Sequence, residues 1–201
     1  MILFLDVVSP IPEIHLINDK IILDSFKIGG NIDQKLSDHL IPTYLKISNL
    51  YELPENITKL IVTIGPGSYT ALRVGASFIA GLKQSLNIPV AMVSLENIYN
   101  YLNKSNKPIG IYFESSNKQN FFSYMKGKTF VHDKIENDNY QIPKSTSFIY
   151  YNLFTPKFLN KKIESENFST KNIVLKNLDL LEFSNNHLIK PIYISNNSIL
   201  N

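Results

Sequence analysis

The sequence predicts an α/β fold with a mixed sheet flanked by helices, and two observations carry that prediction. Residues 60–64 form an apolar, β-branched run, Gly65-Pro66-Gly67 turns the chain, and a long helix over 70–86 precedes another strand. A strand, a crossover helix and a second strand form a parallel pair. Nearer the N-terminus the chain alternates weakly around the turn pair Asn18-Asp19, which predicts antiparallel strands.

The first half of the chain can be assigned element by element. Ser94, followed by Glu96 in the first turn, is the expected cap of a short helix. Apolar residues fall near helical spacing between residues 34 and 50, although Pro42 lies awkwardly in the first turns of that helix. The expected elements are strands at 2–8, 13–17, 20–28, 60–64 and 89–93 and helices at 34–50, 70–86 and 95–102.

The elements of the second half are harder to predict from the sequence. The polar residues 103–107 are the expected boundary between two parts, residues 1–103 and residues 104–201. Beyond it, short apolar stretches between polar loops predict strands from length and composition alone. The expected elements are strands at 109–113, 121–125, 128–132, 147–151 and 173–175, a short helix at 156–163 and an extended segment at 191–194.

The core of the long helix, residues 71–82, is unusual for the outer layer of an α/β domain. Arg73 is its one charged residue, and small residues stand on nearly every side, at Ala71, Gly75, Ala76, Ser77, Ala80 and Gly81. A helix that is apolar all round is buried all round, and two glycines cost about 1 kcal/mol each relative to alanine in a helix interior. We therefore expect one face to cover the sheet and the other to meet a second polypeptide that approaches the backbone closely.

Length and composition are those of a globular protein. The chain has 201 residues, a net charge of +3 and no cysteine, so disulfides and cysteine metal sites are excluded. A mildly basic chain without a basic run does not by itself predict nucleic-acid binding. Residues 1–8 are too short for a signal peptide and no apolar stretch is long enough to span a bilayer, so the expected location is the cytoplasm, away from membranes.

No catalytic, cofactor-binding or metal-binding residue is predicted. The Gly-Pro-Gly-Ser-Tyr-Thr turn lacks the lysine of a Walker loop and the third glycine of a dinucleotide loop. Asp6, at the end of the first strand, is followed by Val7 and Val8, which leave no glycine for a phosphate to approach, and we interpret it as structural. The four histidines are far apart in sequence, and no Gly-x-Ser-x-Gly elbow marks a nucleophile.

Arg73 is the only arginine of the chain, and its role has two interpretations. In a buried setting a guanidinium needs a carboxylate or a carbonyl as its partner. Arg73 therefore either anchors the helix within the fold or reaches into another protein, and the sequence favours neither.

One long motif resembles a known family. It runs Gly65-Pro66-Gly67-Ser68-Tyr69-Thr70-Ala71-Leu72-Arg73-Val74-Gly75, continues with Gly81-Leu82, and includes Ile88-Pro89-Val90 and Val93-Ser94-Leu95-Glu96. It is similar to the signature of the TsaB (YeaZ) proteins, which usually have Phe where Tyr69 stands and Gly where Ala71 stands. The closing Pro191-Ile192-Tyr193-Ile194 resembles the family's Pro-x-Tyr-Leu-Arg, with Ser195 in place of the arginine.

The resemblance implies an actin-like ATPase (ASKHA) fold with two ribonuclease-H-like halves, the second of them shortened. TsaB proteins are accessory subunits in threonylcarbamoyladenosine synthesis, and their partner TsaD transfers the threonylcarbamoyl group from threonylcarbamoyl-adenylate to N6 of A37 in tRNAs that read ANN codons. The resemblance therefore implies a catalytically inactive paralogue without cofactor or metal. This paralogue forms a heterodimer with a TsaD-like transferase, is joined by a TsaE-like ATPase, and meets tRNA only through the complex.

The resemblance also implies that helices of the first half bind TsaD. The expected partner-binding residues lie on the motif helix and its cap, at Ser68, Tyr69, Thr70, Leu72, Arg73, Gly75, Ala76, Ile79 and Ala80. Two other interpretations stay open. The chain is either a homo-oligomeric interaction protein whose apolar helix meets its own copy or an independent ATP-dependent kinase on the same superfold.

Overall fold

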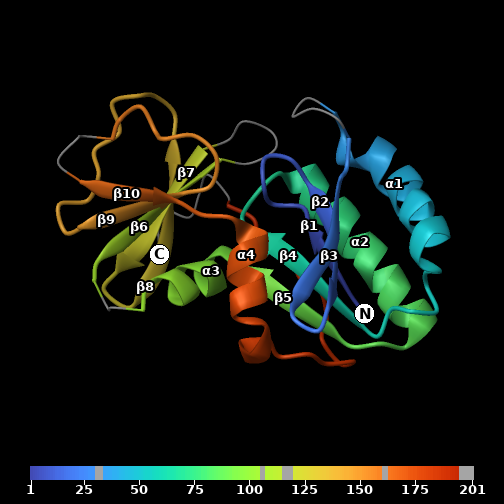
Figure 1. The fold of residues 1–201 in the computed structure, drawn as a ribbon. Helices are drawn as coiled ribbons and strands as arrows, with labels where there is room; N and C mark the ends of the chain where they lie inside the picture. Colours follow the sequence, from blue (N-terminus) through green and yellow to red (C-terminus); the bar gives the residue numbers. More distant parts are fainter. Residues whose placement is uncertain (30–33, 105–106, 115–119, 160–162, 195–201) are drawn as a thin grey trace.

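The protein is built from two five-stranded sheets that lie side by side (Figure 1). The computed structural model describes residues 1–29, 34–104, 107–114, 120–159 and 163–194. Helices α1 and α2 lie together against the first sheet, and α3 and α4 lie between the two sheets (Figure 1). The predicted mixed sheet flanked by helices is confirmed.

The first sheet has the strand order β3-β2-β1-β4-β5. Strand β1 is antiparallel to β2 and parallel to β4, and in the register Phe4 stands opposite His15 on one side and Ile61 on the other. Every element expected in this half is present. The bounds are β1 Ile2–Asp6, β2 Glu13–Asn18, β3 Ile21–Lys27, α1 Leu36–Tyr51, β4 Lys59–Gly65, α2 Tyr69–Leu86, β5 Val90–Ser94 and α3 Leu95–Leu102.

The second sheet has the strand order β10-β9-β6-β7-β8. Strands β6, β7 and β8 form an antiparallel meander. Strand β9 pairs in parallel with the other edge of β6, and β10 pairs in parallel with β9. The bounds are β6 Ile109–Glu114, β7 Asn120–Lys126, β8 Thr129–Ile135, β9 Phe148–Tyr151 and β10 Glu164–Asn167, followed by α4 Thr170–Lys176 and a 3-10 turn, Leu178–Leu180.

Three sequence predictions for this half are wrong or incomplete. Residues 173–175 belong to a helix, α4, because an apolar run this short does not distinguish strand from helix. The described part of 156–163 is a turn, in which Leu159 N donates to Pro156 O at 3.0 Å, while 160–162 lie outside the described residues. Strand β10 was not predicted, because Glu-Ser-Glu-Asn is a polar edge strand with no apolar alternation.

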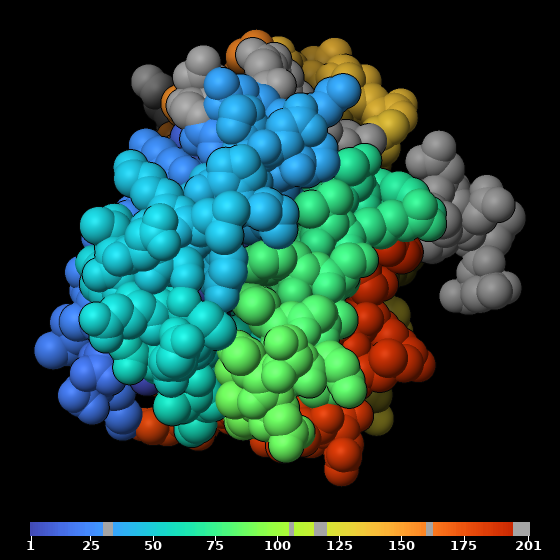
Figure 2. Space-filling model, turned by 90° about the vertical axis from the view of Figure 1, so that its right-hand side faces the viewer, coloured from blue at the N-terminus to red at the C-terminus, as the bar shows by residue number. Residues whose placement is uncertain are grey.

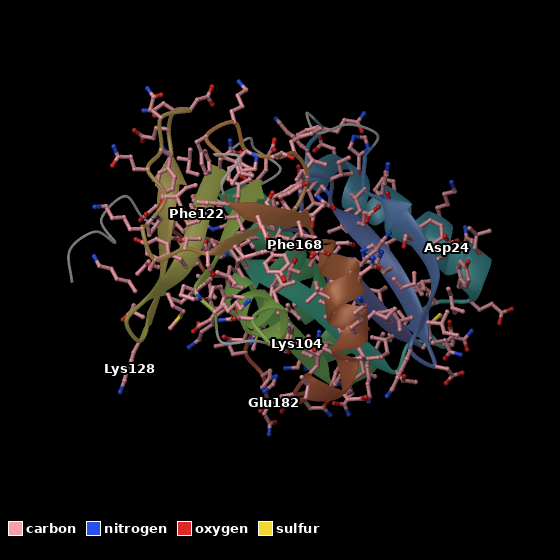
Figure 3. All side chains as sticks on the ribbon, turned by 60° about the vertical axis from the view of Figure 1, so that its left-hand side comes forward. Asp24, Lys104, Phe122, Lys128, Phe168 and Glu182 are labelled. Carbon is pink, nitrogen blue, oxygen red and sulfur yellow. The ribbon has the colours of Figure 1, made fainter. Side chains whose placement is uncertain are left out.

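One hydrophobic core runs through both halves. It joins Leu5 of the first sheet to Phe113 of the second, and includes Phe168, which follows β10, and Val174 of α4. Figure 3 shows Phe168 at the junction of the two sheets, whereas Phe122 lies within the second. The chain after β10 therefore packs back towards the first sheet, and the division into residues 1–103 and 104–201 stays a prediction.

Helices α2 and α3 begin at the serines that their sequences indicate. The Ser68 hydroxyl accepts a hydrogen bond from Ala71 N at 3.5 Å, so Ser68 caps α2. At α3, Ser94 Oγ accepts from Asn97 N at 3.1 Å, and Asn97 Oδ1 accepts from Ser94 N at 2.8 Å. This reciprocal pair is a capping box. In the described ranges, no helix combines the length and hydropathy of a membrane span.

Helix α2 lies close to its own sheet at Gly75. A Cβ atom built on Gly75 would stand 2.6 Å from Val7 Cγ1, and Gly75 is buried. The close approach that the glycine permits is therefore made within the chain. Gly81, six residues further on, is exposed and has nothing within 4 Å of the position of its Cβ.

The two glycines predict opposite effects of the same substitution. Gly75→Ala is expected to lower the free energy of unfolding by about 1–3 kcal/mol, because the added methyl group overpacks the contact with Val7. Gly81→Ala is the matched control and is expected to raise it by up to about 1 kcal/mol through helix propensity. Urea denaturation of both variants measures this, and equal changes would contradict the intramolecular contact.

Candidate partner surface and the cleft between the sheets

The carboxylate of Asp6 is fully engaged by its own chain. It accepts hydrogen bonds from Val8 N at 3.1 Å, Ser9 N at 3.2 Å, Ser9 Oγ at 2.5 Å and Thr63 Oγ1 at 3.0 Å. Burial raises the pKa of the Asp6 carboxyl, while these hydrogen bonds act in the opposite direction. Asp6 therefore fixes the loop after β1, as the structural interpretation predicted.

The loop after β1 packs under helix α2 and its preceding turn. Val7 faces Gly75, and a Cβ on Gly67 would stand 3.3 Å from Val8 Cγ1. Both valines are buried. Two branched apolar side chains thus occupy the space between the end of β1 and the β4–α2 turn.

A cavity of about 200 Å³ lies between the two sheets, with residues of both halves in its wall. From the first half it is lined by Ser9, Glu13 and His15, and from the second by Thr170 and Lys171 among others. The wall is also a contact between the halves. Ser9 Oγ is 3.2 Å from Thr170 Oγ1, and Lys171 Nζ is 3.9 Å from Glu13 Oε2.

His15 is a buried titratable group of this cavity wall. Its Nδ1 is 2.9 Å from Ser25 Oγ, whereas its Nε2 has no hydrogen-bond partner among the described residues and lies 3.6 Å from Glu13 Oε2. Burial lowers the pKa of His15 to about 3, and nearby Lys171 acts in the same direction. Burial also raises the pKa of Glu13. His15 is therefore a neutral imidazole near neutral pH.

The other described residues that could bind a metal ion or take part in catalysis do not lie together. His132 is packed in the second sheet, with Nδ1 2.8 Å from Ser123 Oγ, and burial lowers its pKa to about 4. Among the residues that the structure describes, no three His, Cys, Asp or Glu side chains are grouped so as to hold a metal ion.

Helix α2 has an outer face of small and polar residues. The exposed positions are Tyr69, Thr70, Arg73, Ser77, Ala80, Gly81, Gln84 and Ser85. These positions recur at helical spacing and form one stripe along the helix. The stripe contains no large aliphatic side chain, and at Gly81 nothing lies within 4 Å of the position of a Cβ.

Helix α1 lies beside this stripe and exposes large apolar side chains. Ile41 is 49% exposed and Leu45 is 55% exposed, one turn apart on the same face. The two helices meet through Tyr44 of α1 and Phe78 of α2, whose rings are 5.2 Å apart and nearly perpendicular. Figure 2 shows α1 and α2 as neighbouring bands on one face of the molecule.

The structure divides the expected partner-binding residues into two groups. Tyr69, Thr70, Arg73, Ala76 and Ala80 are exposed or half-buried and belong to the outer side of α2. Leu72, Gly75, Ile79 and Ser68 are buried against the rest of this chain. These four pack inward or, for Ser68, cap the helix, and partner binding by any of the nine residues stays a prediction. The all-apolar pattern concealed which side faced the sheet.

Arg73 lies on the exposed side and stacks on its own helix. Its guanidinium carbon is 3.9 Å from the centroid of the Tyr69 ring, and Nη2 donates a hydrogen bond to the Tyr69 hydroxyl. Among the described residues, no carboxylate forms an ion pair with Arg73. Of the two interpretations, an ion-pair anchor between elements of the fold is therefore not observed.

Sequence analysis missed three residues of this face. Ile41 and Leu45 carried a signal, because they are apolar residues on the side of the predicted helix away from Leu36 and Ile47. Tyr193 carried none, because its place beside Tyr69, at 4.6 Å between ring centroids, depends on the path of the chain through the second half.

Comparison with known proteins gives concordant results. A family model described as "TsaD: tRNA N6-adenosine threonylcarbamoyltransferase" matches residues 33–175. "tRNA threonylcarbamoyladenosine biosynthesis protein TsaB" of Bacillus subtilis (strain 168) is 44% identical over 41 residues, which are 20% of this chain and 18% of that protein. This chain therefore aligns with under a fifth of that relative's length.

Two solved structures share the fold over nearly the whole chain. "YeaZ from Pseudomonas aeruginosa" matches with a TM-score of 0.64 and 12% identity, over 96% of this chain and 99% of that one. A crystal structure described as an uncharacterized protein with similarity to peptidase YEAZ, also from Pseudomonas aeruginosa, matches with a TM-score of 0.63 and 13% identity over the same shares. The predicted fold of mixed sheets flanked by helices is confirmed, and it is the fold of these two structures.

The buried histidine of the cleft predicts a specific pH dependence of stability. Folded His15 stays neutral down to about pH 3, whereas histidine in an unfolded chain takes up a proton below about pH 6.5. Acid therefore favours the unfolded state, and the free energy of unfolding falls between pH 6.5 and 3, by up to about 1.4 kcal/mol per pH unit from this residue.

The comparison with His15→Phe isolates that contribution, because Asp6, Glu13 and His132 titrate in both proteins. Urea denaturation between pH 4 and 7 is expected to show a shallower loss of stability in the variant than in the natural chain. Parallel pH profiles would contradict the neutral, buried state of His15.

Proposed function

We propose that this chain, which belongs to the TsaD family and is similar to the TsaB (YeaZ) proteins, is a non-catalytic accessory subunit in the synthesis of threonylcarbamoyladenosine on tRNA. In this proposal it forms a heterodimer with a TsaD-like transferase and supports that enzyme's activity. A TsaE-like ATPase joins the pair, and tRNA reaches this subunit only through the complex.

The observation that carries the proposal is the face formed by α1 and α2. Exposed Ile41 and Leu45 stand beside a helix whose outer stripe includes the small residues Thr70, Ser77 and Ala80. Apolar side chains next to small residues let a partner helix approach closely and bury its own side chains in the grooves. Exposed apolar residues grouped in this way are typical of protein interaction sites.

The geometry at the end of β1 supports a subunit that binds rather than catalyses. The oxygens of Asp6 are occupied by Val8, Ser9 and Thr63, and Val7 fills the space below α2. Placing a phosphate there would require the loop to give up its hydrogen bonds and its packing on Gly75. This supports the accessory role over the alternative of an independent kinase.

Ala80→Arg is expected to weaken the heterodimer with the TsaD-like transferase of the same organism at least tenfold. Ala80 is exposed in the middle of the stripe, so a long charged side chain obstructs a partner helix without disturbing the core. Asn100→Arg, at an exposed position of α3, is the matched control and is expected to leave affinity unchanged. Isothermal titration calorimetry measures both affinities.

Size-exclusion chromatography with light scattering provides the direct test. The natural chain mixed with the transferase at micromolar concentration is expected to elute as a heterodimer. Two separate peaks would overturn the proposal. A homodimer that does not exchange with the transferase would instead favour the alternative in which the α1–α2 face meets its own copy.

A further inference from the structure

The C-terminal segment, residues 184–194, returns to the turn before α2 and is held there by backbone hydrogen bonds to β5 and β4. Ser184 pairs with Val90 through two N–H···O bonds of 3.2 Å, and Ile192 N donates to Ile64 O at 2.7 Å. Gly65, with φ +113°, gives this segment its room, since a Cβ there would stand 2.5 Å from Ile192 O. The last described residues therefore run along the β4–α2 turn.

This path places Tyr193 on Tyr69. Their ring centroids are 4.6 Å apart with planes at 46°, and Arg73 stacks on Tyr69 at 3.9 Å. The three side chains, from the first turns of α2 and from the C-terminal segment, form what we call the Tyr-Arg cluster. Figure 2 shows α2 between α1 on one side and the C-terminal segment, drawn in red, on the other.

The Tyr-Arg cluster is assembled but not enclosed. Tyr69 is 50% exposed and Tyr193 is 42% exposed, and Arg73 is exposed as well. An aromatic contact that served only the fold would gain more by being buried. Tyrosine and arginine are also the residues over-represented among those that contribute most to protein–protein binding.

We propose that the Tyr-Arg cluster is part of the docking surface for the TsaD-like transferase, so that the C-terminal segment contributes Tyr193 directly to the interface. This inference rests on the proposed function, and it extends the surface beyond α1 and α2. The cluster overlaps the exposed stripe of α2, which contains Tyr69, Arg73 and Ala80, and Tyr193 extends it. The charge of Arg73 fits a partner carboxylate, because among the described residues it has no acidic partner.

The anchoring of the segment makes the cluster suited to binding. Tyr193 follows directly on Ile192, whose N–H is held at Ile64 O, and its ring already rests on Tyr69. Side chains that are held in place before association lose less conformational entropy when they are buried. A partner therefore meets a pre-formed aromatic and cationic surface.

The test compares variants of the full chain by calorimetric titration against the TsaD-like transferase. Tyr193→Ala and Arg73→Gln are each expected to weaken binding at least tenfold, and Tyr193→Phe, which keeps the ring, less than twofold. Phe154→Ala is the control, since Phe154 is an exposed aromatic residue of the second half that does not belong to the Tyr-Arg cluster. The melting temperatures of the free variants are expected to differ little, because the altered side chains are exposed.

The outcomes separate this inference from the proposed function. If the natural chain binds and Ala80→Arg weakens binding, but Tyr193→Ala and Arg73→Gln bind as the natural chain does, the cluster inference is overturned and the proposed function stands. If the natural chain does not bind the transferase, both are overturned. If Tyr193→Ala keeps its affinity for the transferase but lowers the affinity of the assembled complex for tRNA, the cluster binds RNA and the inference is also wrong.

Discussion

The contact between Val7 and Gly75 determines how helix α2 lies on the first sheet. Val7 is positioned by its backbone, since its N–H donates to Thr63 Oγ1 at 2.9 Å and Thr63 in turn donates to Asp6 at 3.0 Å. A side chain at residue 75 would push the helix away from the loop. The hydrogen bonds at the end of β1 therefore set the distance and rotation of a helix more than sixty residues further along the chain.

That rotation decides which residues α2 offers to its surroundings. With Gly75 turned inward, Leu72 and Ile79 join the core, and Arg73, Ser77 and Ala80 are left outside. The two glycines of the helix thus have different roles. Gly75 accommodates Val7, whereas Gly81 faces open space and leaves the backbone accessible on the outer side.

The first half could be predicted from the sequence because its elements are long and regular. The run that becomes β4, the serine caps and the helical spacing of α1 and α2 are local signals, and all of them hold. The inward direction of α2 was only weakly marked in the sequence, because Leu72 and Ile79 share one face while small residues stand on nearly every other side. The expected contact at Gly75 was real, but its partner was Val7 of the same chain.

The second half and the partner face could be predicted only in part, for two physical reasons. Polar edge strands such as β10 and short helices such as α4 have no periodicity long enough to identify. The neighbour of Tyr69 is set by long-range topology, since the chain must cross the whole second sheet before Tyr193 reaches it. Local sequence patterns predict elements, whereas surfaces assembled from distant segments require the fold.

The contacts between the two halves across the cleft affect the proposed docking surface, although they lie elsewhere in the molecule. Ser9 meets Thr170, and Lys171 lies near Glu13, where the chain turns back from the second sheet into α4. The C-terminal segment follows that helix, and its last described residues reach the β4–α2 turn. The position of Tyr193 therefore depends on how the second half is held against the first. In the proposed complex, the polar residues of the cleft stabilise the arrangement of the docking surface. Val7, in the loop after β1, also supports that surface, because it packs against the inner side of α2.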